Sequence, residues 1–187
     1  MTAPADTVAD SAASASATAR AANVRLMIFD VDGILTDGSL HFGPEGEVTK
    51  TFNVLDGHGI KMLQQSGVAT AIISARQSPI VLRRATDLGI HHVFQGIHDK
   101  RSAFEQLLAQ TKVSADACGF IGDDVIDLPI LLRVGFAASV PNAHAEVRSR
   151  VHYVTQASGG RGAARELCDF ILRAQGNYEA ALAPYLA

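Results

Sequence analysis

Short apolar runs, each followed by a segment with helical periodicity, recur along most of the chain and strongly constrain its fold. The clearest runs are residues 26–29, 68–73, 91–94, 118–121 and 136–140. Continuous apolar runs of this length are typical of parallel strands buried on both faces. Because strands alternate with helices so regularly, the sequence predicts a three-layer α/β fold, with a parallel sheet and helices on both faces.

The length and composition predict one folded domain behind a short tail. The chain has 187 residues, of which 48% are hydrophobic, enough for one substantial core over residues 23–187. Residues 1–22 are rich in Ala, Ser and Thr and lack bulky apolar side chains, which predicts a disordered tail. An Ala-rich helix is the alternative. The segment has no charged region followed by an apolar one, as a secretory signal requires.

The charge and hydropathy pattern argues against two classes of partner. The net charge is −3 and there is no run of Lys and Arg, so we expect no nucleic-acid partner. No apolar stretch approaches the length needed to cross a bilayer, so we expect no membrane partner. Cys118 and Cys168 lie in apolar contexts and are interpreted as buried thiols, which fits a cytoplasmic protein; a disulfide between them is the alternative.

Residues 38–53 break the alternation of strands and helices. Leu40 and Phe42 alternate with polar residues, a Gly-Pro-Glu-Gly turn follows, and Val48 continues the alternation on the other side. This pattern predicts an inserted β-hairpin. Its apolar positions have no obvious cover within the chain, which invites association with other subunits.

Charged and polar residues follow the predicted strands directly. Asp30 and Asp32, with Gly33 behind them, end the first apolar run. Such carboxylates are costly to desolvate unless they bind something, such as a hard cation; the alternative is that they only cap a loop. Similar positions after later runs are occupied by Ser74, Arg76, Lys100, Asp123, Asp124 and Asp127. The carboxyl ends of parallel strands converge on one crevice, so we expect these residues to share one site.

The order of these segments resembles the motifs of the haloacid dehalogenase-like phosphatases. The matching segments are DVDGILT, IISAR, the isolated Lys100 and GDDVID, within roughly residues 25–175. The resemblance implies a Rossmann-like fold and a magnesium-dependent phosphatase. It assigns Asp30 as the nucleophile that forms an aspartyl-phosphate and Asp32 as the general acid and base.

The same resemblance implies roles for the remaining polar residues. Mg²⁺ would be held by the Asp30 carboxylate, the Asp32 backbone carbonyl and Asp123. Asp127, and with a less defined role Asp124, would orient these ligands from behind. Ser74 and Lys100 would complete the catalytic set by contacting the phosphoryl group.

The gaps between the motifs hold no cap domain, so another element must close the site to water. KTFNVLDGHGIKML, IISARQSPIVLRRATDLGI and SGGRGAARELCDFIL resemble the capless, tetrameric 3-deoxy-D-manno-octulosonate 8-phosphate phosphatases of lipopolysaccharide precursor biosynthesis. The resemblance implies a homotetramer in which a neighbour closes each site. The implied substrate contacts are Asp32, Asn53, Val54, Leu55, Asp56, Gly57, Lys61, Arg76, Arg84 and Lys100. Lys61 stands where Arg is commoner, so the contact keeps its charge but loses a planar fork.

Residues 159–165 carry a further hypothesis. This glycine-rich segment is either a flexible loop or a lid in which Arg161 meets the substrate anion, over its own active site or a neighbour's. Alternatives for the function also stay open. A phosphatase of 2-keto-3-deoxynononate 9-phosphate usually has Glu at the position of Arg76, and a phosphomutase usually has a cap. A catalytically silent scaffold or regulatory module would be expected to lack Asp30 or Asp32.

Overall fold

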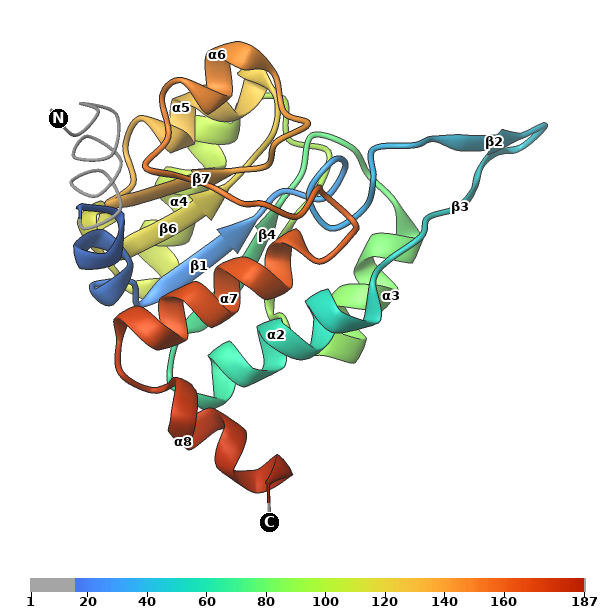
Figure 1. Ribbon diagram of the computed structural model, residues 1–187. Helices are drawn as coiled ribbons and strands as arrows, with labels where there is room; N and C mark the ends of the chain where they lie inside the picture. The colour runs from blue at the N-terminus through green and yellow to red at the C-terminus, as the bar shows by residue number, and fades with distance from the viewer. Residues whose placement is uncertain (1–15, 187) are drawn as a thin grey trace, which may run out of the picture.

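The computed structural model describes residues 16–186 and contains a six-stranded sheet with helices on both faces (Figure 1). Its strands, in chain order, are β1 (Leu26–Phe29), β4 (Ala69–Ile73), β5 (His92–Phe94), β6 (Cys118–Ile121), β7 (Phe136–Ser139) and β8 (Tyr153–Val154). The order across the sheet is β5-β4-β1-β6-β7-β8, and all neighbours are parallel. The predicted three-layer Rossmann-like α/β class is confirmed.

The helices divide between the two faces of the sheet. They are α2 (Val54–Gln65), α3 (Pro79–Leu88), α4 (Lys100–Thr111), α5 (Leu128–Leu131), α6 (Ala145–Arg148), α7 (Ala163–Ala174) and α8 (Tyr178–Leu182). Buried residues of α2, α3 and α7 form one core cluster, and those of α4, α5 and α6 form the other. None of these described helices is long and apolar enough to span a membrane. The described segments between the strands hold no cap domain.

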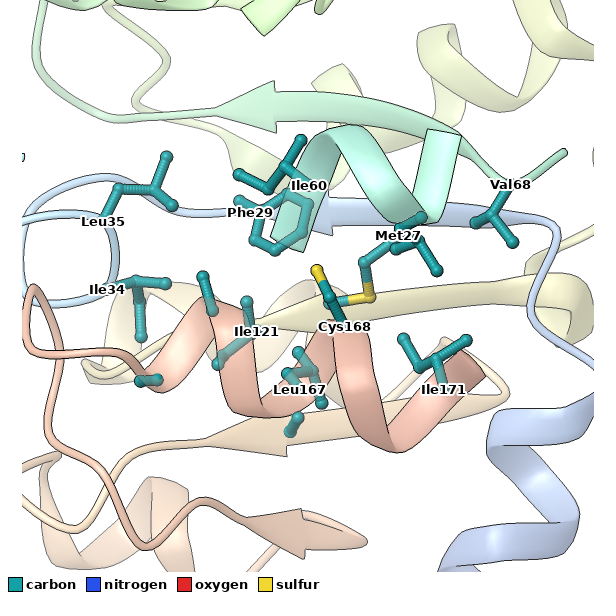
Figure 2. Packing of buried hydrophobic residues seen from close by; sticks show 14 of the residues in the cluster. Met27, Phe29, Ile34, Leu35, Ile60, Val68, Ile121, Leu167, Cys168 and Ile171 are labelled. Atoms are coloured by element: carbon teal, nitrogen blue, oxygen red, sulfur yellow. The ribbon is translucent and has the colours of Figure 1, made fainter. Parts of the chain in front are cut away.

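Strand β1 supplies side chains to both clusters because successive residues of a strand point to opposite faces. Met27 and Phe29 pack on the side of α2 and α7, while Leu26 and Ile28 pack on the side of α4. Figure 2 shows the first of these cores, in which residues of β1 and of the loop after it face residues of α2 and α7. Met27, Phe29 and Ile34 come from β1 and its loop, Ile60 comes from α2, and Leu167, Cys168 and Ile171 come from α7. The predicted burial of the two cysteines is confirmed, and both are free thiols.

The position of β1 fixes where a ligand can bind. The chain builds the sheet outward from β1 in both directions, with β4 and β5 on one side and β6, β7 and β8 on the other. The loops that leave β1 and its neighbours therefore diverge at the carboxyl end of β1. Such a switch point is the usual ligand crevice of an open parallel sheet.

The inserted hairpin is formed by β2 (His41–Gly43) and β3 (Gly46–Thr49), which pair antiparallel as predicted. It projects well away from the sheet (Figure 1). Phe42 and Val48 are each 61% exposed and Leu40 is 42% exposed. The chain therefore leaves the apolar positions of the hairpin uncovered.

The prediction of a disordered N-terminal tail is wrong for residues 16–22. Residues 16–22 form a helix, and Ala17 and Ala21 are buried in the core cluster that also contains residues of α7 and β1. Arg20 also donates to the backbone carbonyl of Gly135, at 3.0 Å. These tertiary contacts stabilise a helix that the local composition makes marginal. Residues 1–15 of the predicted tail lie outside the described residues.

Several helix boundaries differ from those that the sequence predicts. Residues 56–67 predict a helix that begins at Asp56, but α2 begins two residues earlier, because the Asn53 side chain caps it by accepting from the backbone N–H of Leu55 at 2.8 Å. Residues 127–134 predict one helix, but the structure has a 3₁₀ turn, Val125–Asp127, followed by the short α5. A helix is also predicted from about Asn142, where the structure has the short α6, and α8 is not predicted.

Candidate active site

Two acidic residues at the end of β1 form the floor and wall of a cleft. Asp30 directly follows β1 and is buried, while Asp32 is partly exposed. Gly33 behind them has φ +88°, and a Cβ there would overlap the carboxylate of Asp123. A side chain at this position would be both strained and in the way, so glycine lets the Asp123 carboxylate approach the loop after β1.

A buried lysine joins the carboxylates beneath the cleft. Lys100 is the first residue of α4, and its Nζ donates to Asp30 Oδ1 at 2.9 Å and to Asp127 Oδ1 at 2.5 Å. The other Asp127 oxygen accepts from the backbone N–H groups of Asp123 and Asp124, at 3.0 and 3.2 Å. Asp127 thus fixes both the lysine and the loop after β6, as expected of a residue that orients ligands from behind.

Burial and mutual repulsion shift the pKa values of the carboxyl groups in this cluster. Burial, reinforced by repulsion from Asp127, raises the pKa of Asp30 to about 8 despite Lys100. Burial and the neighbouring carboxylates Asp127 and Asp124 raise the pKa of Asp123 to about 7. Burial alone would lower the pKa of Lys100, but Asp30 and Asp127 raise it, so the lysine stays charged.

The donor set fits a hard divalent cation. Carboxylate oxygens of Asp30, Asp123 and Asp127 lie within 4.8 Å of one another. Asp123 forms no ion pair among the residues that the structure describes. Oxygen-only ligation at this charge density is what Mg²⁺ prefers. Because Asp127 already bonds to Lys100 and two amides, Asp30 and Asp123 are the better direct ligands.

The cleft above these residues brings together most of the predicted catalytic set. Its volume is about 140 Å³, and it is lined by Asp30, Asp32, Ser74, Ala75, Arg76, Asp123, Asp124 and Ile126. Ser74 comes from the end of β4, and its hydroxyl accepts from the backbone N–H of Arg76 at 3.3 Å. The Arg76 guanidinium faces Asp32, with Nε 3.9 Å from Oδ2. A cleft this small and polar suits a phosphoryl group rather than a whole sugar.

The other predicted substrate contacts lie elsewhere in the same chain. Asn53, Asp56, Gly57 and Arg84 line a separate, much smaller pocket, and the Arg84 guanidinium donates to the Asn53 carbonyl at 3.3 Å. Val54 and Leu55 are exposed at the start of α2, and Lys61 is exposed further along that helix. One chain therefore does not gather all the predicted contacts around Asp30.

Asp56 has a partner within the chain. It is buried, and its two oxygens accept from the backbone N–H groups of Gly162 and Arg165, at 3.3 and 2.8 Å. These bonds cap the start of α7 and tie it to α2, so the side chain does not face a ligand in this arrangement.

The glycine-rich segment before α7 packs against the loop that carries the aspartates. The Gly160 N–H donates to the Ile34 carbonyl at 2.8 Å, and a Cβ on Gly159 would overlap the Gly33 carbonyl. Arg161 remains largely exposed and reaches Asp37 at 3.5 Å. Close backbone packing explains the glycines here, and the segment of each chain lies beside its own first loop.

Two residues of the hairpin were not predicted as part of the site. Lys50 is buried and forms ion pairs with Asp32 and with Glu47. A lysine in a polar hairpin ordinarily lies in solvent, so no local signal distinguishes this one. Only the return of the chain after β3, from the projecting hairpin toward β1, brings it to the acidic loop.

Comparison with known proteins agrees with this geometry. Residues 87–167 match the family model of haloacid dehalogenase-like hydrolases. The fold and the carboxylate–lysine cluster at the end of β1 define the chain as a hydrolase of this class. A 3-deoxy-D-manno-octulosonate 8-phosphate phosphatase of Yersinia pestis is 46% identical over 162 residues, 87% of each chain. The protein belongs to the family of 3-deoxy-D-manno-octulosonate 8-phosphate phosphatases.

Solved structures extend the likeness to the whole fold. A probable phosphatase of Pseudomonas syringae has a TM-score of 0.90 and 51% identity, covering 92% of this chain and 98% of that one. A 3-deoxy-D-manno-octulosonate 8-phosphate phosphatase of Moraxella catarrhalis has a TM-score of 0.88 and 43% identity, covering 90% and 97%. That structure is a complex with a magnesium ion, a phosphate ion and the sugar acid.

Proposed function

We propose that this protein is a magnesium-dependent phosphatase that hydrolyses 3-deoxy-D-manno-octulosonate 8-phosphate to the sugar acid and phosphate. The observation that carries the proposal is the cleft lined by Asp30, Asp32 and Asp123, with Lys100 paired to Asp30 beneath it, in a chain of this family. The reaction would serve lipopolysaccharide precursor biosynthesis in the cytoplasm, as the resemblance implies.

The residues at the cleft support two successive half-reactions. Asp30 attacks phosphorus, and the bond to the leaving oxygen breaks as an aspartyl-phosphate forms. Asp32 gives a proton to the leaving alcohol. It later takes a proton from the water that attacks phosphorus, as the bond between phosphorus and the Asp30 oxygen breaks and phosphate is released. Lys100, bonded to Asp30, keeps positive charge beside the nucleophile, and Ser74 can donate to a phosphate oxygen.

A divalent cation completes the charge balance. Asp30, Asp123 and the backbone carbonyl of Asp32 would hold Mg²⁺, with Asp127 and Asp124 supporting them. The ion supplies neutralisation of the repulsion between an anionic nucleophile and an anionic phosphate. The raised pKa values of Asp30 and Asp123 support this reading, since both carboxyls gain from a cation beside them.

We also infer a homotetramer in which subunits complete one another's sites. Two observations support it: the apolar positions of the hairpin are uncovered, and the predicted contacts on α2 do not line the cleft of their own chain. Exposed groups at the start of α2, together with Lys61, Arg84 and the exposed Arg161, could then reach a neighbour's substrate. The Arg76 guanidinium, at the cleft itself, suits the substrate carboxylate.

Light scattering tests the assembly. The wild-type protein should be a tetramer at micromolar concentration, and Phe42→Ser should shift it toward smaller species with lower activity on the sugar-acid phosphate. Thr51→Ser, an exposed position beyond β3, is the control. A stable, fully active wild-type monomer would contradict the assembly.

Phosphate release across a panel of phosphorylated sugars and sugar acids tests the function. We expect the octulosonate 8-phosphate to be preferred, and EDTA to abolish turnover. Asp30→Asn should remove turnover while preserving the fold, because the amide matches the carboxylate in shape but is not nucleophilic. Retention of about a tenth of wild-type activity, with reversion to Asp excluded by mass spectrometry, would refute the nucleophile assignment.

A further inference from the structure

Lys50 lies at the base of the hairpin, immediately after β3, and its side chain is 1% exposed. Its Nζ forms an ion pair with Asp32 Oδ1 and another, at 2.9 Å, with Glu47 Oε1. A lysine is almost never fully buried unless it is paired, because desolvating the ammonium without a partner is strongly unfavourable. Its burial here therefore depends on these two carboxylates.

Glu47 links the lysine to a third part of the chain. Its second oxygen, Oε2, accepts from the Ser78 hydroxyl at 2.5 Å. Ser78 is the N-cap residue of α3, but its hydroxyl makes no cap bond and is used for Glu47 instead. Burial alone would favour the neutral acid, yet the bonds from Ser78 and Lys50 hold the pKa of Glu47 below its ordinary value. Lys50 is thus held between two carboxylates, one of which is anchored on α3.

The consequence falls on the orientation of Asp32. Lys50 takes Oδ1, whereas Oδ2 lies on the side of Arg76, which lines the cleft. One oxygen is fixed by an interaction that solvent hardly reaches, and the other remains for exchange with a ligand. A carboxylate on a surface loop would otherwise sample several rotamers.

We infer that Lys50 is a positioning residue that holds the Asp32 carboxylate in the orientation for proton transfer to the leaving group. The inference rests on the proposed function, in which Asp32 is the general acid. Glu47 and Ser78 hold the lysine in place, so the bond between β3 and the start of α3 also affects the orientation of the Asp32 carboxylate. Displacement of a catalytic group by about 1 Å can cost about a hundredfold in rate, which makes such a support kinetically visible.

Two model substrates of similar size separate this role from a general loss of structure. Benzyl phosphate releases a basic alcohol that needs a proton, whereas para-nitrophenyl phosphate releases a stable phenolate that does not. The ratio kcat/KM reports the steps through the first phosphoryl transfer, in which the acid acts. Lys50→Met should lower kcat/KM for benzyl phosphate by at least about tenfold, and for para-nitrophenyl phosphate by less than about threefold.

Controls keep the experiment decisive. Arg101→Met removes an exposed cation that pairs with Glu105 of its own helix α4, and it should leave the kcat/KM of both substrates unchanged. Ser78→Ala leaves Lys50 in place. It should lower kcat/KM for benzyl phosphate more than for para-nitrophenyl phosphate, as Lys50→Met does, but by a smaller factor. It carries the test if Lys50→Met does not fold.

The outcomes are distinct. Equal losses on both substrates, or no loss on either, would overturn the role of Lys50 while leaving the phosphatase intact. A wild-type protein that hydrolyses no phosphate ester would overturn the proposed function and this inference together.

Discussion

Replacing Lys100 by methionine removes the cation that two buried carboxylates share, while keeping an aliphatic stem of similar length. The Lys100 side chain is 1% exposed, and those of Asp127 and Asp30 are 0% and 8% exposed. Each carboxylate loses a charge-assisted hydrogen bond, at 2.5 and 2.9 Å. Removing one partner of a buried ion pair costs about 3–5 kcal/mol, because the remaining charge has no compensation.

The assay is urea denaturation followed by circular dichroism, in EDTA so that no divalent cation replaces the lysine. We expect the free energy of unfolding to fall by about 3–5 kcal/mol in Lys100→Met. Arg101→Met is the matched control: it is the next residue of α4 and pairs with Glu105 at 2.8 Å, but both side chains are more than half exposed. Such a pair contributes little.

Equal stability of the two variants would refute the reasoning. It would mean that the carboxylates take up protons or water at no cost when the lysine is removed. Activity provides an independent readout, because Lys100→Met should also lose phosphatase turnover, whereas Arg101→Met should keep it.

Two further predictions concern the metal and the first loop. Burial raises the pKa of Asp30 to about 8 and that of Asp123 to about 7, so a cation that binds there must displace protons. The affinity for Mg²⁺ should therefore weaken from pH 8 to pH 6. Calorimetry that shows no change in affinity would contradict this. The free energy of unfolding in EDTA should change with pH in the opposite direction to the Mg²⁺ affinity. The raised pKa values of Asp30 and Asp123 favour the folded state at acid pH, and that stability is lost as the pH rises to about 8. Gly33→Ala should lose most turnover, because its Cβ would overlap the Asp123 carboxylate at φ +88°. Gly67→Ala, with φ +94° and open space around it, should lose stability alone, and similar activity losses in both would point to strain rather than to the site.

The fold class and the acidic centre were predictable because their signals are local. A strand buried on both faces must be apolar throughout, so Leu26–Phe29 is recognisable without any knowledge of its neighbours. A carboxylate directly after such a strand, as in Asp30, is costly to desolvate, so its presence indicates that it binds something. The parallel arrangement then places all strand ends together, which is why Ser74, Asp123 and Lys100 could be assigned to one place.

Boundaries and the N-terminal helix were less predictable because they depend on weak local preferences. Residues 16–22 lack the bulky apolar side chains that are typical of a core helix, and the short α5 stands where a longer helix is predicted. A helix this short is marginal alone, and packing against the core decides whether it forms.

The sequence by itself determined the parallel α/β fold, the hairpin and the acidic centre, since each follows from the pattern of a continuous segment. Only the tertiary structure decided the partners of Lys50 and Asp56. Lys50 is buried because the chain returns from the projecting hairpin to the loop that carries Asp32, and Asp56 caps a helix that begins far along the chain. A charged group can be buried without a large cost only when a distant segment supplies an opposite charge or a set of hydrogen-bond donors. The local sequence pattern does not show which segment will do so.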